Sequence, residues 1–223
     1  MKYLNALKII IFCFLTYACT STTEKEVILY EIKKDGKWGW YKDGDKEINP
    51  RYSGEILNGK PNGKGSILFP DGAEYHGELK NGKLNGYGKY SYHHGDIYEG
   101  EWLDNKKHGK GKYKWGKSSK WSGDEFDGQW YENKEHGYGK YTSSNGNIYQ
   151  GQWKNGMQTG RGTWITSDRF YSGYFLNDKL NGIGAMIRSS GEQAIGWWKD
   201  GNQINVHYYK ETGKYIGSII DGK

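Results

Sequence analysis

The sequence is short of cysteine, of long apolar runs and of net charge, and each shortage excludes a class of protein. Cys13 and Cys19 are the only cysteines among 223 residues, so a framework of several disulfides is excluded. The apolar run at residues 9–15 is too short for a membrane-spanning helix, which needs about 20 residues. The formal charge is +6, with lysine and glutamate interspersed, so the sequence predicts no nucleic-acid partner.

Proline and aliphatic residues are also scarce, whereas glycine, tyrosine and tryptophan are abundant. The chain has 3 prolines, 35 glycines, 20 tyrosines and 10 tryptophans. Glycine disfavours long helices by about 1 kcal/mol per residue, whereas Tyr and Trp fit the pleated surface of a strand. Glycine does not recur at every third residue, so collagen is excluded. The composition therefore predicts an all-β fold with a core of aromatic rings.

The first residues have the layout of a signal peptide, which we predict to span residues 1–18. Two lysines precede the apolar run, and small residues follow it. The end of this segment, LTYAC, resembles the lipobox of bacterial lipoproteins, although Thr16 occupies a position that is usually aliphatic. An ordinary signal peptidase would also accept Thr16 and Ala18, and both enzymes would cut between Ala18 and Cys19.

Cysteine usage favours the lipoprotein interpretation. Cleavage would remove Cys13 and leave Cys19 as the first residue of the mature chain, without a disulfide partner. Cys19 is therefore the predicted lipidation site, and the alternative is an incidental cysteine in an uncleaved anchor. Residues 19–27 are predicted to form a polar tether. On this interpretation the protein is exported and lies in the bacterial cell envelope, anchored by lipid to a membrane surface.

A repeat with a step of 22–28 residues runs through the body of the chain. Each unit starts with an aromatic residue, has glycine two residues on and an apolar or aromatic residue four residues on, and ends with glycines eleven and thirteen residues on. Both segments alternate with period two, which predicts strands, and an Asn-Gly-type turn joins them into one hairpin. The units start at Tyr52, Tyr75, Tyr98, Phe126, Tyr149 and Tyr171, with a partial seventh unit at Ala194.

A single hairpin cannot bury its aromatic face, so the units are expected to stack side by side. In the second strand the two glycines are expected to share a face with the aromatic residue that follows them, and to leave room for a ring of the next unit. The rings would then form a continuous internal column. The predicted fold is an all-β, elongated, curved single sheet of stacked antiparallel β-hairpins, about 60–70 Å long for six to seven units.

Two units show the pattern well: YEGEWLDNKKHGKGKY at residues 98–113 and YQGQWKNGMQTGRGTW at residues 149–164. The pattern resembles the MORN repeat, and the resemblance covers residues 52–201, the predicted MORN repeat array. It implies an elongated array of antiparallel hairpins. MORN proteins mostly serve as adaptors, and some members are linked to membranes or acidic phospholipids.

The flanks of the array are predicted to extend the sheet. Residues 28–51 resemble a single WG repeat and are predicted to form a β cap, with turns at residues 35–36 and 43–44. Residues 202–223 are predicted to form a C-terminal β-hairpin cap that turns at residues 211–213. Caps at both ends would protect the sheet from pairing with other strand edges.

The sequence gives little evidence of chemistry. Residues 77–83 read G-x-x-x-x-G-K, most of a nucleotide-binding P-loop, but Leu84 follows where a Mg²⁺-binding Ser or Thr is required. No His or Cys spacing indicates a metal site, and His108 and His136 are interpreted as polar residues beside turns. Neither a carboxylate pair in a cleft nor an activated nucleophile is evident. We therefore predict no enzyme activity, no cofactor and no metal.

The candidate binding surface is the strand face opposite the aromatic column. Outward Glu and Gln side chains, together with outward lysines, are interpreted as a solvated charge ladder. Exposed aromatic residues beside lysines could bind a partner, although plain surface tyrosines are the simpler interpretation; Trp115 and Trp121, which flank a five-residue insertion, are grouped with them. The candidate residues are Tyr87, Lys89, Lys110, Lys112, Tyr138 and Lys140.

The leading hypothesis is a non-enzymatic repeat scaffold or adaptor, anchored by lipid in the cell envelope, that contacts an unidentified protein partner. The alternative is a surface that binds acidic phospholipid headgroups or cell-wall glycan through its exposed lysines and tyrosines. In the lipid alternative, the Cys19 anchor and the basic strip would both contact the membrane.

Overall fold

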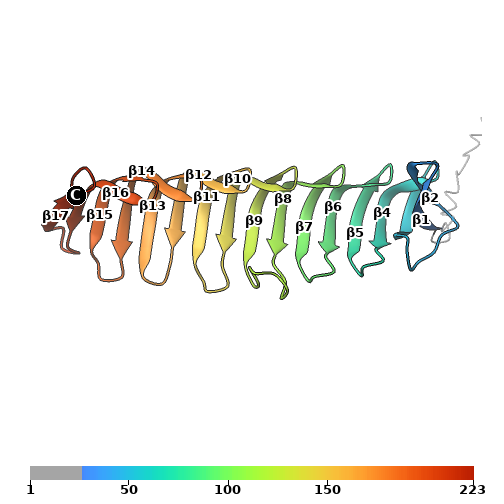
Figure 1. Cartoon of the computed structure of the whole chain (residues 1–223), viewed down its shortest axis with the longest axis horizontal. Coiled ribbons are helices and arrows are strands. Elements are labelled where there is room, and N and C mark those ends of the chain that lie inside the picture. Colours follow the sequence, from blue (N-terminus) through green and yellow to red (C-terminus); the bar gives the residue numbers. More distant parts are fainter. Residues whose placement is uncertain (1–26) are drawn as a thin grey trace, which may run out of the picture.

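The computed structural model describes residues 27–223, and every regular element among them is a β-strand. The strands join into one 17-stranded sheet that is much longer than it is wide (Figure 1). At about 4.8 Å between neighbouring strands, the sheet extends roughly 75 Å. The strands are β1 (Val27–Lys34), β2 (Lys37–Tyr41), β3 (Arg51–Leu57), β4 (Lys60–Leu68), β5 (Glu74–Lys80), β6 (Lys83–Ser91), β7 (Ile97–Leu103), β8 (Lys106–Lys114), β9 (Glu125–Tyr131), β10 (Lys134–Thr142), β11 (Ile148–Lys154), β12 (Met157–Ile165), β13 (Arg169–Leu176), β14 (Lys179–Arg188), β15 (Gln193–Lys199), β16 (Asn202–Tyr209) and β17 (Tyr215–Ile219).

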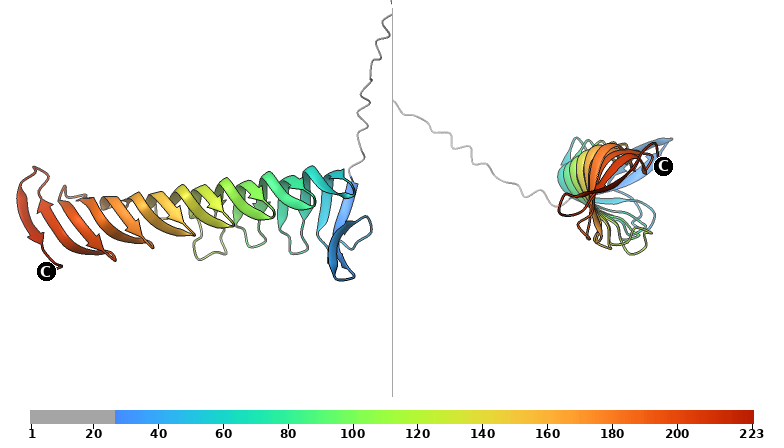
Figure 2. Two further views of the ribbon diagram at one scale, coloured as in Figure 1. Left: turned by 90° about the horizontal axis from the view of Figure 1, so that it is seen from above. Right: turned by 90° about the vertical axis from the view of Figure 1, so that its left-hand side faces the viewer.

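The sheet is antiparallel throughout, and from β3 to β17 the order in space is the order in the sequence. At the amino-terminal end, β1 lies between β2 and β3. Seen from above, the strands curl along the long axis so that the hairpins follow one another like turns of a spring (Figure 2). The predicted elongated, curved single sheet of stacked antiparallel hairpins is confirmed.

Two-residue turns join the strands of each hairpin, and both turn residues have positive φ, as a type I′ turn requires. Asn81 and Gly82 have φ of 53° and 81°, and Asn105 has 67° after Asp104 at 48°. The second turn residue also forms hydrogen bonds with the preceding hairpin. The backbone amide of Asn105 donates to the Leu84 carbonyl at 3.0 Å, and the side-chain oxygen of Asn105 accepts from the Leu84 amide at 2.7 Å. The predicted Asn-Gly-type turns are confirmed, and they join neighbouring units as well.

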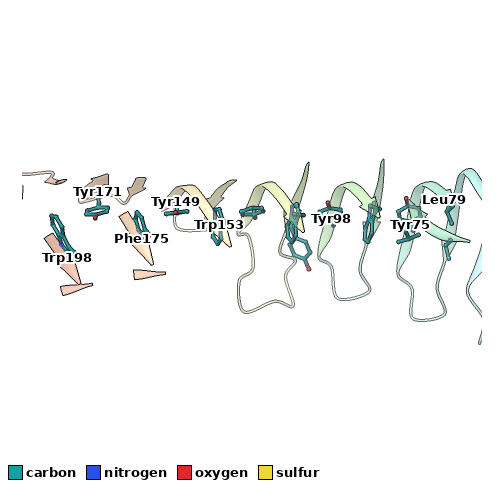
Figure 3. Close-up of a cluster of buried hydrophobic side chains, with 14 of the residues drawn as sticks. Tyr75, Leu79, Tyr98, Tyr149, Trp153, Tyr171, Phe175 and Trp198 are labelled. Carbon is teal, nitrogen blue, oxygen red and sulfur yellow. The ribbon is translucent and has the colours of Figure 1, made fainter. Parts of the chain in front are cut away.

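An aromatic column runs along the inner face of the sheet. The ring that starts each of the first six units is almost completely buried. The residues four positions on, most often tryptophan, fill the spaces between these rings (Figure 3). Tyr98 meets Trp102 at 5.0 Å and Trp130 at 5.3 Å, edge to face in both cases. Edge-to-face pairs are worth about 0.5–1.5 kcal/mol beyond their buried area, so the column can replace the missing aliphatic core. The same geometry links Phe126, Trp153, Tyr149, Phe175, Tyr171 and Trp198.

The central glycines of each hairpin make room for the ring of their own unit. A Cβ on Gly88 would lie 2.2 Å from the Tyr75 hydroxyl oxygen, and one on Gly77 would lie 2.5 Å from it. Because the ring lies flat over this pair, the Tyr75 hydroxyl reaches the Glu78 carbonyl at 2.8 Å. The prediction that the glycines accommodate a ring of the next unit was wrong. The next unit instead supplies Trp102, whose indole N–H donates to the Gly88 carbonyl at 3.1 Å.

The last unit contains the reverse arrangement of large and small residues. Its starting position holds Ala194, and Val206 takes the place of the second-strand glycine, opposite Gly196. Both side chains are buried, at 3 % and 0 % exposed. Where the ring is absent, a branched aliphatic side chain fills the same space. This exchange shows that the ring and the glycine beneath it form one packing unit.

Each second strand has a pair of glycines, and the first glycine of the pair lies in a β-bulge. It does not make room for a ring. Gly86 has φ of +74°, and the pairing of β5 with β6 shifts register at this point. A Cβ on Gly86 would lie 2.5 Å from a Glu78 carboxylate oxygen. The prediction that Gly86 faces the column was therefore wrong, because two extra residues in β6 at the bulge interrupt the alternation of faces.

Candidate binding surfaces

The bulges give a structural role to the outward Glu and Gln side chains that the sequence presented as a solvated charge ladder. Each one folds over the bulge glycine and accepts a hydrogen bond from the backbone amide that follows. The Glu101 carboxylate accepts from the Lys110 amide at 2.9 Å, and the Gln129 amide oxygen accepts from the Tyr138 amide at 2.8 Å. Glu55, Glu78 and Gln152 are placed in the same way.

The predicted binding residues all lie on the outer face. Tyr87 and Lys89 are on β6, Lys110 and Lys112 are on β8, and Tyr138 and Lys140 are on β10. Tyr87 and Tyr138 are each 53 % exposed. The middle of this face is a row of directly paired residues, called here the outer row, which runs His76, Lys89, Glu99, Lys112, Asp127 and Lys140.

Acids alternate with lysines along the outer row, so the row is not a continuous basic strip. The Lys112 ammonium lies 2.7 Å from a Glu125 carboxylate oxygen, and this hydrogen bond raises the pKa of Lys112. The Tyr87 hydroxyl donates to Glu99 at 3.1 Å, and desolvation together with this carboxylate raises the pKa of Tyr87. The exposed pairs add little stability individually, because water screens them. Together they cancel much of the local positive charge.

An exposed apolar region, called here the outer patch, covers the carboxyl-terminal part of the same face. It consists of Phe170, Ile183, Ile187, Ile195 and Trp197, which are 39–55 % exposed. Ile183 pairs directly with Trp197, and Phe170 pairs with Ile187. A shallow depression of about 560 Å³ adjoins it, lined partly by Arg161, Tyr174 and Ile183. Contiguous apolar surface of this kind marks interaction sites in soluble proteins.

The inner face carries two polar clusters that the sequence did not indicate. The Lys107 ammonium lies 4.2 Å from the Tyr113 ring centre and 4.3 Å from the Trp130 ring centre. Burial lowers the pKa of Lys107 to about 8 and raises the pKa of nearby Glu135. Lys107 occupies the position of Leu84 in the preceding unit, so its aliphatic stem contributes to the core.

Buried carboxylates tie the wide loops of adjacent units together. Asp96 accepts from the Tyr113 hydroxyl at 2.5 Å and from the Gly116 amide at 2.8 Å. Burial alone would raise the pKa of Asp96, but these bonds and His94 outweigh it and hold the pKa below its usual value. Trp115, which was grouped with the exposed aromatics, instead packs on Tyr113 at 4.8 Å; Trp121 is exposed as expected.

A model of the family described as "MORN repeat" matches residues 52–74, 75–97, 98–120, 126–148, 149–168 and 171–193. The chain belongs to the MORN-repeat family. The resemblance seen in the sequence is thereby confirmed over the body of the chain, and the MORN units coincide with the hairpins of the sheet.

Two solved structures show similarity to this chain at low identity. The TCP10c domain of Sas-4 from Drosophila melanogaster is 12 % identical over 69 % of this chain and 90 % of that one, with a TM-score of 0.41. The TCP10 domain of CPAP from Danio rerio, as its E1021V mutant, is 14 % identical over 77 % and 94 %, with a TM-score of 0.25. A comparison with curated proteins gave no match.

Neither a metal site nor a membrane-crossing helix is present in the part of the MORN protein that the structure describes. Residues 27–223 contain no cluster of three His, Cys, Asp or Glu side chains that could bind a metal ion. They also contain no helix with the length and apolar character needed to cross a bilayer. Cys19 and the predicted signal peptide lie outside the described residues.

The outer patch is the surface that sequence reasoning missed in this MORN array. A signal for it was available in the alternation of the two strands. On β14, Ile183, Ala185 and Ile187 alternate with glycine and methionine, and on β15, Ile195 and Trp197 alternate with alanine, glycine and tryptophan. Attention to the positions that all units share concealed these positions, where the last units differ. The candidate lysines lie in the earlier units, away from the patch.

Proposed function

We propose that this MORN protein is a non-enzymatic adaptor whose sheet presents the outer patch to a protein partner. The observation that carries the proposal is the exposure of Ile183, Ile195 and Trp197 side by side as one apolar surface on the outer face. Trp is among the residues that most often anchor protein interfaces, and a rigid strand lowers the entropic cost of ordering it on binding. Arg161, beside the patch, favours a partner with an acidic residue at the rim.

The charge pattern favours a protein over an anionic lipid surface as the partner of this face. Glu99 and Asp127 interrupt the lysines of the outer row, so a headgroup layer would meet both signs of charge. A protein surface with its own alternating charges can match such a row, and the match would fix the register of docking. The acidic-phospholipid or glycan alternative for the outer lysines therefore has weaker support.

We further propose that the array is exported and held at a membrane surface of the bacterial envelope by a lipid on Cys19. Support comes from the signal-peptide layout and from the single cysteine that would remain after cleavage. The expected result is palmitate labelling of the wild type and loss of labelling in Cys19→Ser. Equal labelling of the two proteins would rule out the anchor.

The adaptor proposal is tested by affinity purification from envelope extracts with three forms of the full chain. These are the wild type, Trp197→Ser in the outer patch, and Tyr87→Ser as the matched control, since the two side chains are 55 % and 53 % exposed. A partner should be recovered with the wild type and with Tyr87→Ser, and should be lost with Trp197→Ser. Recovery of the same proteins by all three forms, or binding only to vesicles of anionic lipid, would contradict the proposal.

A further inference from the structure

The inner face of the sheet changes character half-way along the array. In the early units a third aromatic residue, two positions after the second-strand aromatic, covers the rings beneath it. Tyr92 packs on Tyr90 at 4.5 Å and on Tyr113 at 6.0 Å, and Trp115 packs on Tyr113 and on Tyr141. Together these covering rings close the inner face of the early units.

The later units lack the covering rings. Their equivalent positions hold Ser143, Thr166 and Arg188. The inner face is correspondingly hollow there. A depression of about 370 Å³ lies beside Tyr141, and another of about 640 Å³ lies beside Met186. Trp164 and Gln158 line both depressions, so the two hollows adjoin at these side chains and are called here the inner groove.

Trp164 is placed differently from the tryptophans of the column. The indole N–H groups of Trp102, Trp130 and Trp153 donate to glycine carbonyls of the preceding unit. Trp164 is half-buried, and within the described part of the chain it has neither a hydrogen-bond acceptor nor a ring contact. The side-chain amide of Gln158 likewise has no partner among the described residues. Trp164 packs against the core on one side, and the floor of the groove therefore offers its half-exposed ring with unused hydrogen-bonding groups beside it.

Three cations, Arg169, Lys179 and Arg188, line the larger depression together with one acid, Asp178. Arg169 and Arg188 lie directly opposite each other on β13 and β14. Like charges at this spacing repel, and each guanidinium is paired with an acid of its own loop, Asp168 at 2.7 Å and Glu192 at 2.8 Å. A ligand carboxylate between the two guanidinium groups would relieve the repulsion and use their remaining donors, which suit carboxylate geometry.

We infer that the inner groove binds an extended chain of acidic sugars, with Trp164 as the stacking platform. A pyranose ring presents weakly positive C–H groups on one face, which suit the negative face of an indole, and hydroxyls at its edge for amides such as Gln158, Asn145 and Asn202. Sugar carboxylates would lie between Arg169 and Arg188. This site is on the opposite face from the outer patch, so it does not depend on the proposed protein contact.

A carbohydrate fits this groove better than an extended peptide. The backbone groups beneath the groove are paired within the sheet, so a peptide would find no unpaired strand edge along which to bond. An oligosaccharide needs only ring faces and side-chain polar groups, and both are present along the two joined depressions.

The test is titration of the full chain with two oligosaccharides, with tryptophan fluorescence as the measure of binding. Hexagalacturonate carries one carboxylate on each ring, and chitohexaose is neutral. Hexagalacturonate should bind about tenfold more tightly, because charge-assisted bonds to the arginines contribute on this scale. The double variant Arg169→Gln with Arg188→Gln should remove that preference. Equal affinity of both oligosaccharides for the wild type would overturn the assignment of the arginines.

Two variants test the platform itself. Trp164→Ala should weaken hexagalacturonate binding about tenfold or more, whereas Trp197→Ala, an exposed tryptophan on the outer face, should bind as the wild type does. Ser143→Tyr is the second variant, in case Trp164→Ala does not fold. It copies Tyr92 and should cover Tyr141 and Trp164, so it should block binding while leaving the fold intact, as judged by circular dichroism.

Three results would refute the site. The first is no binding of either oligosaccharide by the folded wild type. The second is equal loss of affinity in Trp164→Ala and in the Trp197→Ala control. The third is binding of hexaglutamate as tightly as hexagalacturonate, which would indicate recognition of an acidic peptide instead of a sugar.

Discussion

Replacing Gly111 by alanine should destabilise the array, because the added methyl group would overlap a ring that cannot easily move. The ideal Cβ would lie 2.3 Å from the Tyr98 hydroxyl oxygen and 2.5 Å from its Cζ atom. Tyr98 is 0 % exposed and is held between Trp102 and Trp130. The backbone of Gly111 does not have a positive φ, so the substitution adds no backbone strain.

The expected size follows from two contributions. Forcing a methyl group into a packed core costs about 1–3 kcal/mol. Displacing the ring would also weaken the bond from the Tyr98 hydroxyl to the Glu101 carbonyl at 2.9 Å, worth about 1 kcal/mol. The sum is about 2–4 kcal/mol, and for a chain of this length it corresponds to a fall in Tm of roughly 5–15 °C.

Thermal unfolding by circular dichroism measures this change, with Gly146→Ala as the control. Gly146 has φ of +88° and no neighbouring atom within 4 Å, so its substitution costs only the backbone strain, about 1–2 kcal/mol. A second comparison copies the last unit, where Ala194 and Val206 replace ring and glycine. Gly111→Val alone should be severely destabilised, and adding Tyr98→Ala should recover part of the loss. The steric argument fails if Gly111→Ala melts with the control, or if the added Tyr98→Ala destabilises Gly111→Val further.

Three further predictions concern side chains that the repeat pattern alone does not explain. Burial lowers the pKa of Lys107 to about 8, against about 10.4 for an unfolded lysine, so the unfolded state binds more protons in this window and stability should rise from pH 8 to pH 10. In urea unfolding, Lys107→Leu should abolish this rise in the free energy of unfolding and should stabilise the protein at pH 7 by about 1–3 kcal/mol. An unchanged dependence of stability on pH in the variant would contradict the prediction. Glu101→Ala should lower the stability by about 1 kcal/mol, measured by thermal unfolding, because the Lys110 amide loses its acceptor. Glu101→Gln keeps an acceptor and should lower the stability little. Equal melting temperatures for the two variants would exclude a role for Glu101 in holding the bulge. Asp96→Ala should speed hydrogen exchange at the Gly116 amide about tenfold or more, and unchanged exchange would show that another group holds the loop.

Much of the fold could be predicted because the repeat combines two strong local signals. Period-two alternation identifies strands, and residues that tolerate positive φ, such as Asn81 and Gly82, identify the turns between them. Once each unit is a hairpin with one aromatic face, stacking is the only way to bury that face. The wide loops and the placement of β1 between β2 and β3 depend on long-range pairing, which local pattern does not determine.

The detailed packing could not be predicted, because a bulge breaks the alternation on which face assignment depends. Counting by twos from Gly88 places Gly86 on the inner face, but the register shift gives it a positive φ beneath Glu78. The same shift hid the role of Glu101 and its equivalents, which the sequence presents as ordinary surface charge.

The candidate sites were only partly accessible from sequence, since they arise from differences between units. Tyr87 and Tyr138 were correctly expected to be exposed. The apolar outer patch and the inner groove both lie where the later units depart from the shared pattern, at Trp197 and at Ser143, for example. An alignment of units emphasises shared positions and therefore conceals such departures.

The direction of the strands has a mechanical consequence for a protein held at one end. The described chain begins at β1 at one end of the array and finishes at β17 at the other, with the strands running across the long axis (Figure 1). The hydrogen bonds that join neighbouring strands therefore point along the direction of pulling. A load applied between the two ends would open these bonds one strand at a time and not shear a whole ladder at once. The array would yield hairpin by hairpin at low force, releasing extra length gradually while the remaining units stay folded.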